Sequence, residues 1–501
     1  MLQLEKLTIT HQKDLQDLVR DLDLVLNPGE KLAIIGEEGT GKSSLIKAIV
    51  APQLLSSYAH LTGKITNHFH QFGYLPQALE NEDLQLTIMD FLYHNLDYGF
   101  LDFNLFYKYA DQFRLDLDRF DAQNQTLASL SGGERLKVQL LKILATDPDL
   151  LILDEPSSDL DLETLQWLEN FIRQSDKAIL FISHDESLLS RASTAILHLE
   201  LLKKRTEPRA TFYRGNYDQY RQERTEKFEH QLQVAKKERE EHAKKMERHH
   251  RIHQSVEHVL RQTHDSTAGR LLAKKMKNVL SQEKRLKKEA ENLTEIPQDM
   301  DAIQLFFSEI KPLPTSKNLL SWEKKLLPTG QTVNLQIRGQ DKLVITGKNG
   351  VGKTRLLKLL LQDLRARTDL SVGYMPQHYE EEFENQDTPL SFLASVADEE
   401  KARTLLASLK FTRQEVIHAL HNLSGGQKAK LFLARMVLAG NDVLILDEPT
   451  RHFSPTSQPL IRQLLIDYPG AIISVSHDRR FIDEVAALHY QLDDESLVRT
   501  R

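Results

Sequence analysis

Apolar runs of strand length recur in two stretches of the chain. Residues 32–35 and 343–345 form such runs, and each is followed by a glycine-rich turn and then by an apolar segment typical of a helix. Two more runs, residues 150–153 and 443–446, end directly before an Asp-Glu pair. None of the apolar runs approaches the roughly 18 residues that a membrane span needs. We therefore exclude a self-contained transporter and expect no membrane contact.

Residues 218–293 follow a different, helical pattern. They contain no proline and a single glycine, Gly269. Alternating steps of four and three residues mark one face in each half: Phe228, Leu232, Ala235, Arg239, His242, Met246, His249, His253, Val256 and Leu260, then Leu272, Met276, Val279, Glu283, Leu286, Ala290 and Leu293. The spacing predicts an antiparallel hairpin of two helices, with its tip near Asp265 and a paired length of roughly 40 Å at 1.5 Å per residue.

Three histidines fall on the first of these faces. Of these, His249 and His253 are four residues apart, which is a spacing that metal-binding pairs use. The sequence offers no third ligand nearby, so we expect solvated or stacked imidazoles there instead.

Composition and charge narrow the possible functions. The chain has no cysteine, which excludes disulfides, thiolate zinc sites, iron–sulfur clusters and cysteine nucleophiles. The first residues form no secretion signal, so we expect a cytoplasmic protein. The net charge is −7, yet residues 203–295 carry 24 basic against 15 acidic side chains, and the whole excess lies from Lys244 to Lys288. This favours a localised contact with a polyanion, although a long solvated helix has a similar composition.

The same series of motifs occurs twice. Residues 36–43 read GEEGTGKS and residues 347–354 read GKNGVGKT, and both match G-x-x-x-x-G-K-[ST]. The glycines of this motif let backbone N–H groups and a helix N-terminus face phosphates. They predict phosphate binding by Gly36, Gly39, Gly41, Gly347, Gly350 and Gly352. The motif lysines, which would reach the β- and γ-phosphates, are Lys42 and Lys353.

Four further motifs follow in the same order in both halves. They are GY[LM]PQ at residues 73–77 and 373–377, LSGG at 130–133 and 423–426, LDEP at 153–156 and 446–449, and SHD at 183–185 and 476–478. From LSGG onward the copies are offset by 293 residues, whereas the glycine-rich loops are offset by 311, so the first copy holds 18 additional residues.

This series of motifs resembles the ATP-binding cassette (ABC) ATPases. The resemblance covers two cassettes and implies an α/β fold of two P-loop NTPase domains that bind ATP with Mg²⁺ and hydrolyse ATP to ADP and phosphate. We divide the chain into a first cassette at residues 1–210, a basic helical-hairpin linker at residues 211–300 and a second cassette at residues 301–501.

The resemblance also assigns roles to single residues. Glu155 and Glu448 would orient or deprotonate the attacking water, and His184 and His477 would hydrogen-bond the γ-phosphate. The resemblance places Mg²⁺ beside hydroxyl, amide and carboxylate oxygens of each cassette: Ser43, Gln77 and Asp154 in the first, and Thr354, Gln377 and Asp447 in the second.

The resemblance further implies that the two cassettes of one monomer dock head to tail and share two composite sites. Each LSGG motif would offer a serine hydroxyl and glycine N–H groups to the opposite cassette. Ser424 and Gly426 would complete the first site, and Ser131 and Gly133 the second. Bound ATP would hold the halves together, and hydrolysis would open them.

The two copies depart from the family pattern in different places. Glu38 stands where the second loop has the usual Asn349, and residues 450–455 of the second copy form an altered loop after the strand. We therefore expect inequivalent sites, although an altered loop can still support hydrolysis. Trp322 stands 25 residues before the second loop, where the family has an aromatic residue that stacks on adenine, but it is equally suited to packing; His11 has that position in the first copy.

Two fused cassettes joined by a basic helical linker resemble the ABC-F family of translation factors. The resemblance implies that the ATP-bound form binds the E site of the bacterial 70S ribosome, and that the segment from Lys244 to Lys288 reaches 23S rRNA and the P-site tRNA. Residues 450–455 resemble the antibiotic-resistance subgroup, which protects ribosomes from lincosamides, pleuromutilins and streptogramins A. We expect no arm subdomain and no C-terminal extension, and therefore a ribosome-protection protein that hydrolysis releases.

Two alternatives stay open at this point. A housekeeping or stress ABC-F factor that acts on P-site tRNA would differ only in what the tip from Thr263 to Arg270 does, and the tip shows no drug-specific chemistry. An ATPase subunit of a transporter with separate membrane subunits would leave the basic hairpin unexplained.

Overall fold

A computed structural model describes residues 1–94, 101–122, 124–158, 160–202, 207–262, 266–296, 310–383 and 388–501. The chain divides into two compact units. The larger one, here called the cassette unit, comprises Met1–Tyr217 and Met300–Arg501, and the smaller one, the hairpin unit, comprises Asp218–Asp299.

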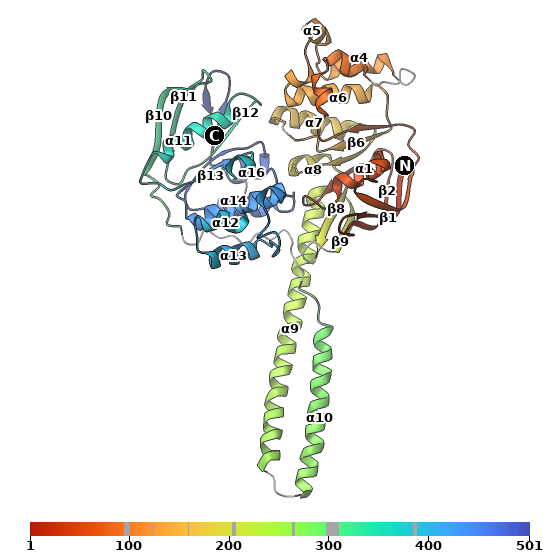
Figure 1. The fold of residues 1–501 in the computed structure, drawn as a ribbon, viewed down its shortest axis with the longest axis vertical. Helices are drawn as coiled ribbons and strands as arrows, with labels where there is room; N and C mark the ends of the chain where they lie inside the picture. The colour runs from red at the N-terminus through yellow and green to blue at the C-terminus, as the bar shows by residue number, and fades with distance from the viewer. Residues whose placement is uncertain are drawn as a thin grey trace. The chain divides into compact units, whose positions relative to one another are not determined.

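A six-stranded sheet lies at the centre of each half of the cassette unit (Figure 1). The strand order in the first half is β5-β6-β7-β3-β8-β9: β5 Phe72–Leu75, β6 Leu150–Asp154, β7 Ala178–Ile182, β3 Lys31–Ile35, β8 Ala195–Leu202 and β9 Glu207–Arg214. All neighbours pair in parallel except β9, which is antiparallel to β8. Every residue of β3, β6 and β7 is buried, as the continuous apolar runs predict for strands covered on both faces.

The second half repeats this topology. Its order is β13-β14-β15-β12-β16-β17: β13 Val372–Met375, β14 Val443–Asp447, β15 Ala471–Val475, β12 Lys342–Gly347, β16 Leu488–Leu492 and β17 Leu497–Arg499. Only β17 runs antiparallel to its neighbour. The prediction of an α/β fold with two P-loop cassettes is therefore confirmed.

Each half adds a small antiparallel sheet. In the first half it has three strands in the order β2-β1-β4: β2 Asp17–Leu26, β1 Leu2–His11 and β4 Ala59–Asn67. In the second half it has two, β10 Asn318–Leu326 and β11 Thr332–Arg338. The extra strand β4 lies within the longer segment between the phosphate loop and LSGG of the first copy, so part of the 18 additional residues completes this sheet.

The remaining elements of the cassette unit are helices. The first half contains α1 Lys42–Val50, α2 Asn81–Gln85, α3 Ile88–Tyr93, α4 Phe103–Gln112, α5 Leu117–Ala122, α6 Gly132–Leu144, α7 Leu162–Gln174 and α8 Glu186–Ala192, with short 3₁₀ turns at Pro52–Leu54 and Leu127–Ser129. The second half contains α11 Lys353–Arg365, α12 Pro389–Ala394, α13 Glu399–Ser408, α14 Gly425–Ala439, α15 Gln458–Ile466 and α16 Arg479–Glu484, with 3₁₀ turns at Tyr379–Glu382 and Leu420–Asn422.

The hairpin unit consists of two long helices that lie side by side (Figure 1). These are α9, Tyr217–Gln262, whose first residue belongs to the cassette unit, and α10, Ser266–Glu291. As residue numbers rise along α9, the numbers of the residues contacted in α10 fall: His242 contacts Leu286, and His249 contacts Val279. This register confirms the antiparallel hairpin. The predicted tip at Asp265 lies outside the described residues.

Two histidines of α9, His242 and His249, are structural parts of the helix pair. The Nε2 atoms of His242 and His249 lie 2.9 Å and 2.8 Å from the main-chain oxygens of Leu286 and Val279. The side chain of His249 is buried, so the interpretation of this residue as solvated or stacked is wrong. A ring N–H bonded to a carbonyl lets a polar side chain occupy an otherwise apolar seam.

Candidate functional site

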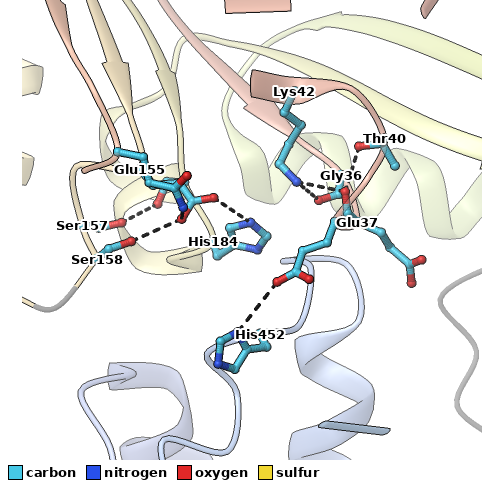
Figure 2. Close-up of polar contacts among 12 residues, drawn as sticks. Gly36, Glu37, Thr40, Lys42, Glu155, Ser157, Ser158, His184 and His452 are labelled. Atoms are coloured by element: carbon cyan, nitrogen blue, oxygen red, sulfur yellow. Dashed lines mark hydrogen bonds and ion pairs between the residues drawn. The ribbon is translucent and has the colours of Figure 1, made fainter. Parts of the chain in front are cut away.

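The two glycine-rich loops have the same local geometry. Gly41 and Gly352 adopt left-handed φ values of 90° and 104°, and α1 and α11 begin at the next residue. The Nζ atom of Lys42 donates to the main-chain oxygens of Gly36 and Glu37 at 2.8 Å and 2.9 Å (Figure 2). Lys353 repeats this at 2.8 Å to both Gly347 and Lys348. Each loop thus closes around its own lysine at a helix N-terminus, where anions bind.

Only glycine fits at the first position of each loop. A Cβ on Gly36 would lie 2.2 Å from the main-chain oxygen of Leu199, and one on Gly347 would lie 2.4 Å from that of Leu492. Strands β8 and β16 therefore approach the two loops closely, and both glycines also have positive φ.

Glu155 lies in a polar environment at the end of β6. Its carboxylate accepts a hydrogen bond from Gln77 at 3.0 Å. It accepts another from Ser158 at 3.3 Å, and its Oε1 lies 3.6 Å from Nε2 of His184 (Figure 2). Burial by itself would raise the pKa of Glu155, but the hydrogen bond and charge of His184, with Lys42, outweigh it and lower the pKa to about 2. This glutamate is ionised at neutral pH.

Glu448 occupies the equivalent position in the second half but has fewer polar neighbours. Its carboxylate accepts one backbone hydrogen bond, from the N–H of His477 at 3.3 Å, and the ring Nε2 of His477 lies 3.8 Å away. Burial, followed by the charge of Asp447, raises the pKa of Glu448 to about 8. This glutamate therefore carries a proton at neutral pH.

Both glutamates have an unusual backbone. The φ angles of Glu155 and Glu448 are 51° and 53°, in the left-handed region that non-glycine residues rarely adopt. Such strain persists where the surrounding structure imposes it, and it is concentrated at functional sites. Because both copies share this conformation, each glutamate side chain leaves the end of its strand in the same direction.

The strand-end aspartates have the chemistry of a magnesium site. Asp154 is buried and its Oδ1 atom has no hydrogen-bond partner in the described chain, while burial raises its pKa to about 6. In the second half, the hydroxyl of Thr354 donates to Asp447 at 2.9 Å. Carboxylate, hydroxyl and amide oxygens are ligands that suit Mg²⁺, which keeps several waters. The residues present fit this ion, which would bind the Oδ1 atom of Asp154 that has no hydrogen-bond partner among the described residues.

A cavity of about 1400 Å³ joins residues of both halves. Most predicted site residues line it: Gly39, Gly41, Lys42, Ser43, Gln77, Glu155, His184, Gly350, Gly352, Lys353, Thr354, Gln377, Asp447, Glu448 and His477. Gly36, Gly347, Asp154, Ser131, Gly133, Ser424, Gly426 and Trp322 do not belong to its lining.

The second LSGG motif lies against the first glycine-rich loop. A Cβ on Gly425 would come within 2.9 Å of the carboxylate of Glu38, and Nδ1 of His452 lies 3.7 Å from the same carboxylate. Lys430 of α14 pairs with Glu37 at 3.2 Å. Burial opposes ionisation of Glu38, but the contact with His452 prevails and its pKa is lowered. A charged carboxylate thus faces the N-terminus of α14 (His452 is labelled in Figure 2).

The first LSGG motif is more exposed. Ser131 caps α6 through a reciprocal pair of hydrogen bonds with Glu134, as Ser424 caps α14 with Gln427. Ser131 is exposed and Glu134 is half-buried, whereas their counterparts Ser424 and Gln427 are half-buried and buried. Gly132 and Arg135 of α6 line the common cavity, whereas the second LSGG motif and α14 contribute no residue to its lining and lie directly against Glu38. The two composite arrangements therefore differ, and the one around Lys42 is the more closed.

The expected adenine contact of Trp322 is wrong for this arrangement. Its side chain is buried in the core of the second half, its Nε1 donates to Asp363 at 2.9 Å, and the Nζ of Lys325 lies 3.9 Å from the centre of its ring. His11, by contrast, lines the cavity together with Tyr58. Tyr58 and Arg135 belong to none of the repeated motifs, so no sequence signal could have revealed them.

The similarity to known proteins also falls in two separate segments of the chain, one in each half. The sequence profile described as ABC transporter matches residues 19–158 and 331–451, which together make up just over half of the chain. The chain belongs to the ABC transporter family. This membership, with the relatives described next, means that the chain is an ATPase that binds ATP in its cassettes.

Several relatives of this ABC chain are named as members of an F family. ABC transporter F family member 2 of Arabidopsis thaliana is 27% identical over 96% of this chain and 75% of its own length. The ATP-binding protein Uup of Haemophilus influenzae is 29% identical over 94% of this chain and 76% of its own. These matches support membership of the ABC-F family.

Among solved structures, the fold is similar to a crystal structure of the archaeal ribosome recycling factor aABCE1 with the ribosomal stalk protein aP1. The TM-score is 0.63 at 16% identity, covering 99% of this chain and 90% of the other. This likeness supports the fold of two ABC cassettes. Among the described helices, none is both long enough and apolar enough to cross a membrane.

Proposed function

We propose that this ABC-F ATPase binds the bacterial 70S ribosome in its ATP-bound form and protects it from antibiotics of the peptidyl-transferase centre. The drugs are of the lincosamide, pleuromutilin and streptogramin A type. In this proposal the hairpin enters from the E site and acts near 23S rRNA and the P-site tRNA, and ATP hydrolysis releases the protein. The proposed parts are a first cassette at residues 1–210, a linker at residues 211–300 and a second cassette at residues 301–501.

The observation that carries the proposal is the basic surface of the hairpin unit. Every one of the following side chains is exposed: Lys244, Lys245, Arg248, Arg251, Arg261, Arg270, Lys274, Lys275 and Lys277. Within the described residues, only Lys245, Arg251 and Arg261 of this set pair with glutamates. Exposed cations without carboxylate partners are available to phosphates, and such contacts supply most of the affinity for a nucleic acid.

The names of related proteins support the same partner. The structural relative is called a ribosome recycling factor and was crystallised with a ribosomal stalk protein. The altered loop at residues 450–455 is the feature that favours the antibiotic-resistance subgroup over other ABC-F proteins.

The proposed hydrolysis uses the ionised carboxylate of Glu155. It accepts a proton from water as the water oxygen bonds to the γ-phosphorus, and the bond to the β–γ bridging oxygen breaks to give ADP and phosphate. Lys42 and the loop N–H groups hold the phosphates. Bound Mg²⁺ would supply positive charge next to them, held by Ser43, Gln77 and Asp154 or, in the second cassette, by Thr354, Gln377 and Asp447.

The test is co-sedimentation of the Glu155→Gln/Glu448→Gln variant with bacterial ribosomes, with and without ATP. We expect recovery with ribosomes only when ATP is present, because the variant binds ATP but does not open. A variant that binds ATP and stays in the supernatant would refute ribosome binding.

A charge reversal on the hairpin then tests the basic surface. Lys274→Glu/Lys275→Glu/Lys277→Glu in α10 should weaken ribosome binding and reduce its dependence on salt. The matched control is Lys236→Glu/Lys237→Glu in α9, which changes exposed lysines outside the segment from Lys244 to Lys288. Equal losses for both variants would contradict a localised contact.

A housekeeping or stress translation factor acting on P-site tRNA is the second candidate. The relative in a plant, at an identity similar to that of the bacterial one, favours this broader role. Expression in a susceptible bacterium separates the two, because only the resistance protein raises the inhibitory concentration of a lincosamide or pleuromutilin.

A further inference from the structure

A cluster of buried ion pairs joins the two halves of the cassette unit. It is formed by α7 and α8 of the first half and by α15 and α16 of the second, away from the glycine-rich loops in sequence. The side chain of Glu186 is 0% exposed and that of Arg462 only 1%. Glu169 is 6% exposed and Arg479 14%. None of these four residues lines the common cavity.

Three of the pairs cross between the halves: Arg480 contacts Glu186 at 2.9 Å, and the other two pairs are bidentate. The Nη1 and Nη2 atoms of Arg462 donate to the two carboxylate oxygens of Glu186, each at 3.3 Å. The Nη1 and Nη2 atoms of Arg479 likewise donate to the two oxygens of Glu169, the first at 3.2 Å. Two parallel N–H···O bonds fix the relative orientation of the partners as well as their distance.

The internal repeat shows that these two pairs are the same contact made twice. With the offset of 293 residues, Glu169 of α7 corresponds to Arg462 of α15, and Glu186 of α8 corresponds to Arg479 of α16. The contact of α7 with α16 is therefore repeated, with the halves exchanged, as the contact of α15 with α8. In each pair the first half supplies the carboxylate and the second half supplies the guanidinium.

The same inversion holds for the pairs within each half. Glu169 pairs with Arg191 at 3.2 Å in the first half. Their counterparts, Arg462 and Glu484, pair at 2.7 Å in the second half with the charges exchanged. These three positions thus carry opposite signs in the two copies, while Arg480 has the uncharged Ser187 as its counterpart.

The inversion decides which cassettes can dock. If two first cassettes from separate chains docked in this geometry, Glu169 would face Glu186 across the interface. If two second cassettes docked, Arg462 would face Arg479. Charges that are this deeply buried are strongly destabilising unless an opposite charge compensates them. Like charges across an interface therefore act against a wrong partner, while complementary ones select the right one.

We propose that this charge-inverted cluster is a specificity interface that pairs the first cassette with the second and rejects a like cassette of another copy. The four side chains lie outside the lining of the cavity, so the cluster aligns the two halves in addition to any contact that a bound nucleotide makes between them. The proposal does not rest on any ribosome function.

The test measures the distance between the cassettes in the full chain. Because the protein has no cysteine, the exposed residues Lys64 and Lys401 can be replaced by cysteine and labelled with a pair of fluorophores, which then transfer energy only while the halves are docked. The variant Glu169→Arg/Arg191→Glu keeps the pair within the first half but places a second guanidinium opposite Arg479. We expect it to lose most of the energy transfer that the wild-type chain shows under the same conditions.

Adding Arg479→Glu to that variant should restore the transfer, because the pair between the halves is again complementary. Arg173→Glu, on the same helix and exposed, is the control and should leave the transfer unchanged. Far-UV circular dichroism confirms that each variant is folded. The proposal is overturned if the double variant keeps the wild-type transfer, or if the triple variant fails to recover it.

Discussion

The two nucleotide sites differ most in the state of their glutamates. Glu155 is ionised, because the hydrogen bond and charge of His184, with the charge of Lys42, outweigh its burial, whereas Glu448 holds a proton because it is buried with little compensation. His184 is itself held by the other half, since its Nδ1 lies 3.2 Å from the main-chain oxygen of Phe453. Two copies of one motif can thus carry different protonation states when their neighbours differ.

The two sites also differ in how closely the LSGG motif of the opposite half approaches the glycine-rich loop. The second LSGG motif faces the loop around Lys42 through Glu38 and His452, while the first LSGG motif stays more exposed. The first site is therefore the more closely assembled of the two in this arrangement. Four predictions test this difference.

The largest effect concerns the two glutamates themselves. At pH 7, Glu155→Gln should lower the ATPase rate about 100-fold or more, which is typical for the loss of a general base. Glu448→Gln should lower it by less than about threefold, since a protonated carboxyl already accepts no proton. Steady-state rates of the two single variants check this. Equal losses would show that binding of ATP makes the sites alike.

The second prediction concerns pH. The residual activity of Glu155→Gln depends on Glu448, whose pKa is raised to about 8. Below that pKa the ionised fraction rises about tenfold per pH unit, so the rate should rise steeply from pH 6 to pH 8 and then level off. The activity of Glu448→Gln depends on Glu155 and should be flat over the same range. A flat profile for both variants would contradict the difference.

The third prediction exchanges the loop residues. Glu38→Asn removes a carboxylate from the place where phosphates bind and makes the first loop like the second, so it should tighten ATP binding at the first site roughly tenfold. Asn349→Glu should weaken binding at the second site to a similar extent. Titration with a fluorescent ATP analogue measures both. No change for Glu38→Asn would mean that His452 already neutralises the carboxylate.

The smallest effect is on stability. The pKa of Glu448 is about 8 in the folded chain and 4.5 as its ordinary value. Between these values the folded state holds a proton that the unfolded state releases, so the free energy of unfolding falls as pH rises from 4.5 to 8. Glu448→Gln removes this term and should be more stable than the wild type by about 1–3 kcal/mol at pH 8 and nearly equal at pH 4.5.

Thermal unfolding at the two pH values checks this last prediction, with a rise in Tm of a few degrees expected at about pH 8. Glu155→Gln is the matched control, because its wild-type carboxyl has a lowered pKa and gives no such gain. A lower Tm for Glu448→Gln at the higher pH would contradict the buried, protonated state.

Much of the architecture was readable from the sequence because its signals are local. Glycines with positive φ, a lysine and a hydroxyl at a helix start, and an apolar strand ending in Asp-Glu each depend on neighbouring residues. The seam of the hairpin was equally local, since a 4-3 spacing places side chains on one face of a helix. These signals located both glycine-rich loops, the strand-end aspartates and the two long helices.

The predictions for Trp322 and His249 failed because they depend on contacts with residues far away in the sequence. Trp322 had the spacing of an adenine contact, but β10 packs it against α11, where Asp363 and Lys325 cover it. His249 was taken as solvated because the sequence does not show that a carbonyl of the opposite helix, at Val279, lies 2.8 Å from its ring. Neither outcome could be derived from spacing alone.

The sequence by itself determined the two cassettes, their phosphate loops and the basic hairpin, because repeated motifs and helical periodicity are properties of residues close together in the chain. Only the tertiary structure decided which glutamate is ionised and which charges meet across the halves. Those properties depend on burial and on neighbours up to 310 residues away, as between Arg479 and Glu169. Electrostatic interactions depend on distance and desolvation in space, and a linear pattern records neither.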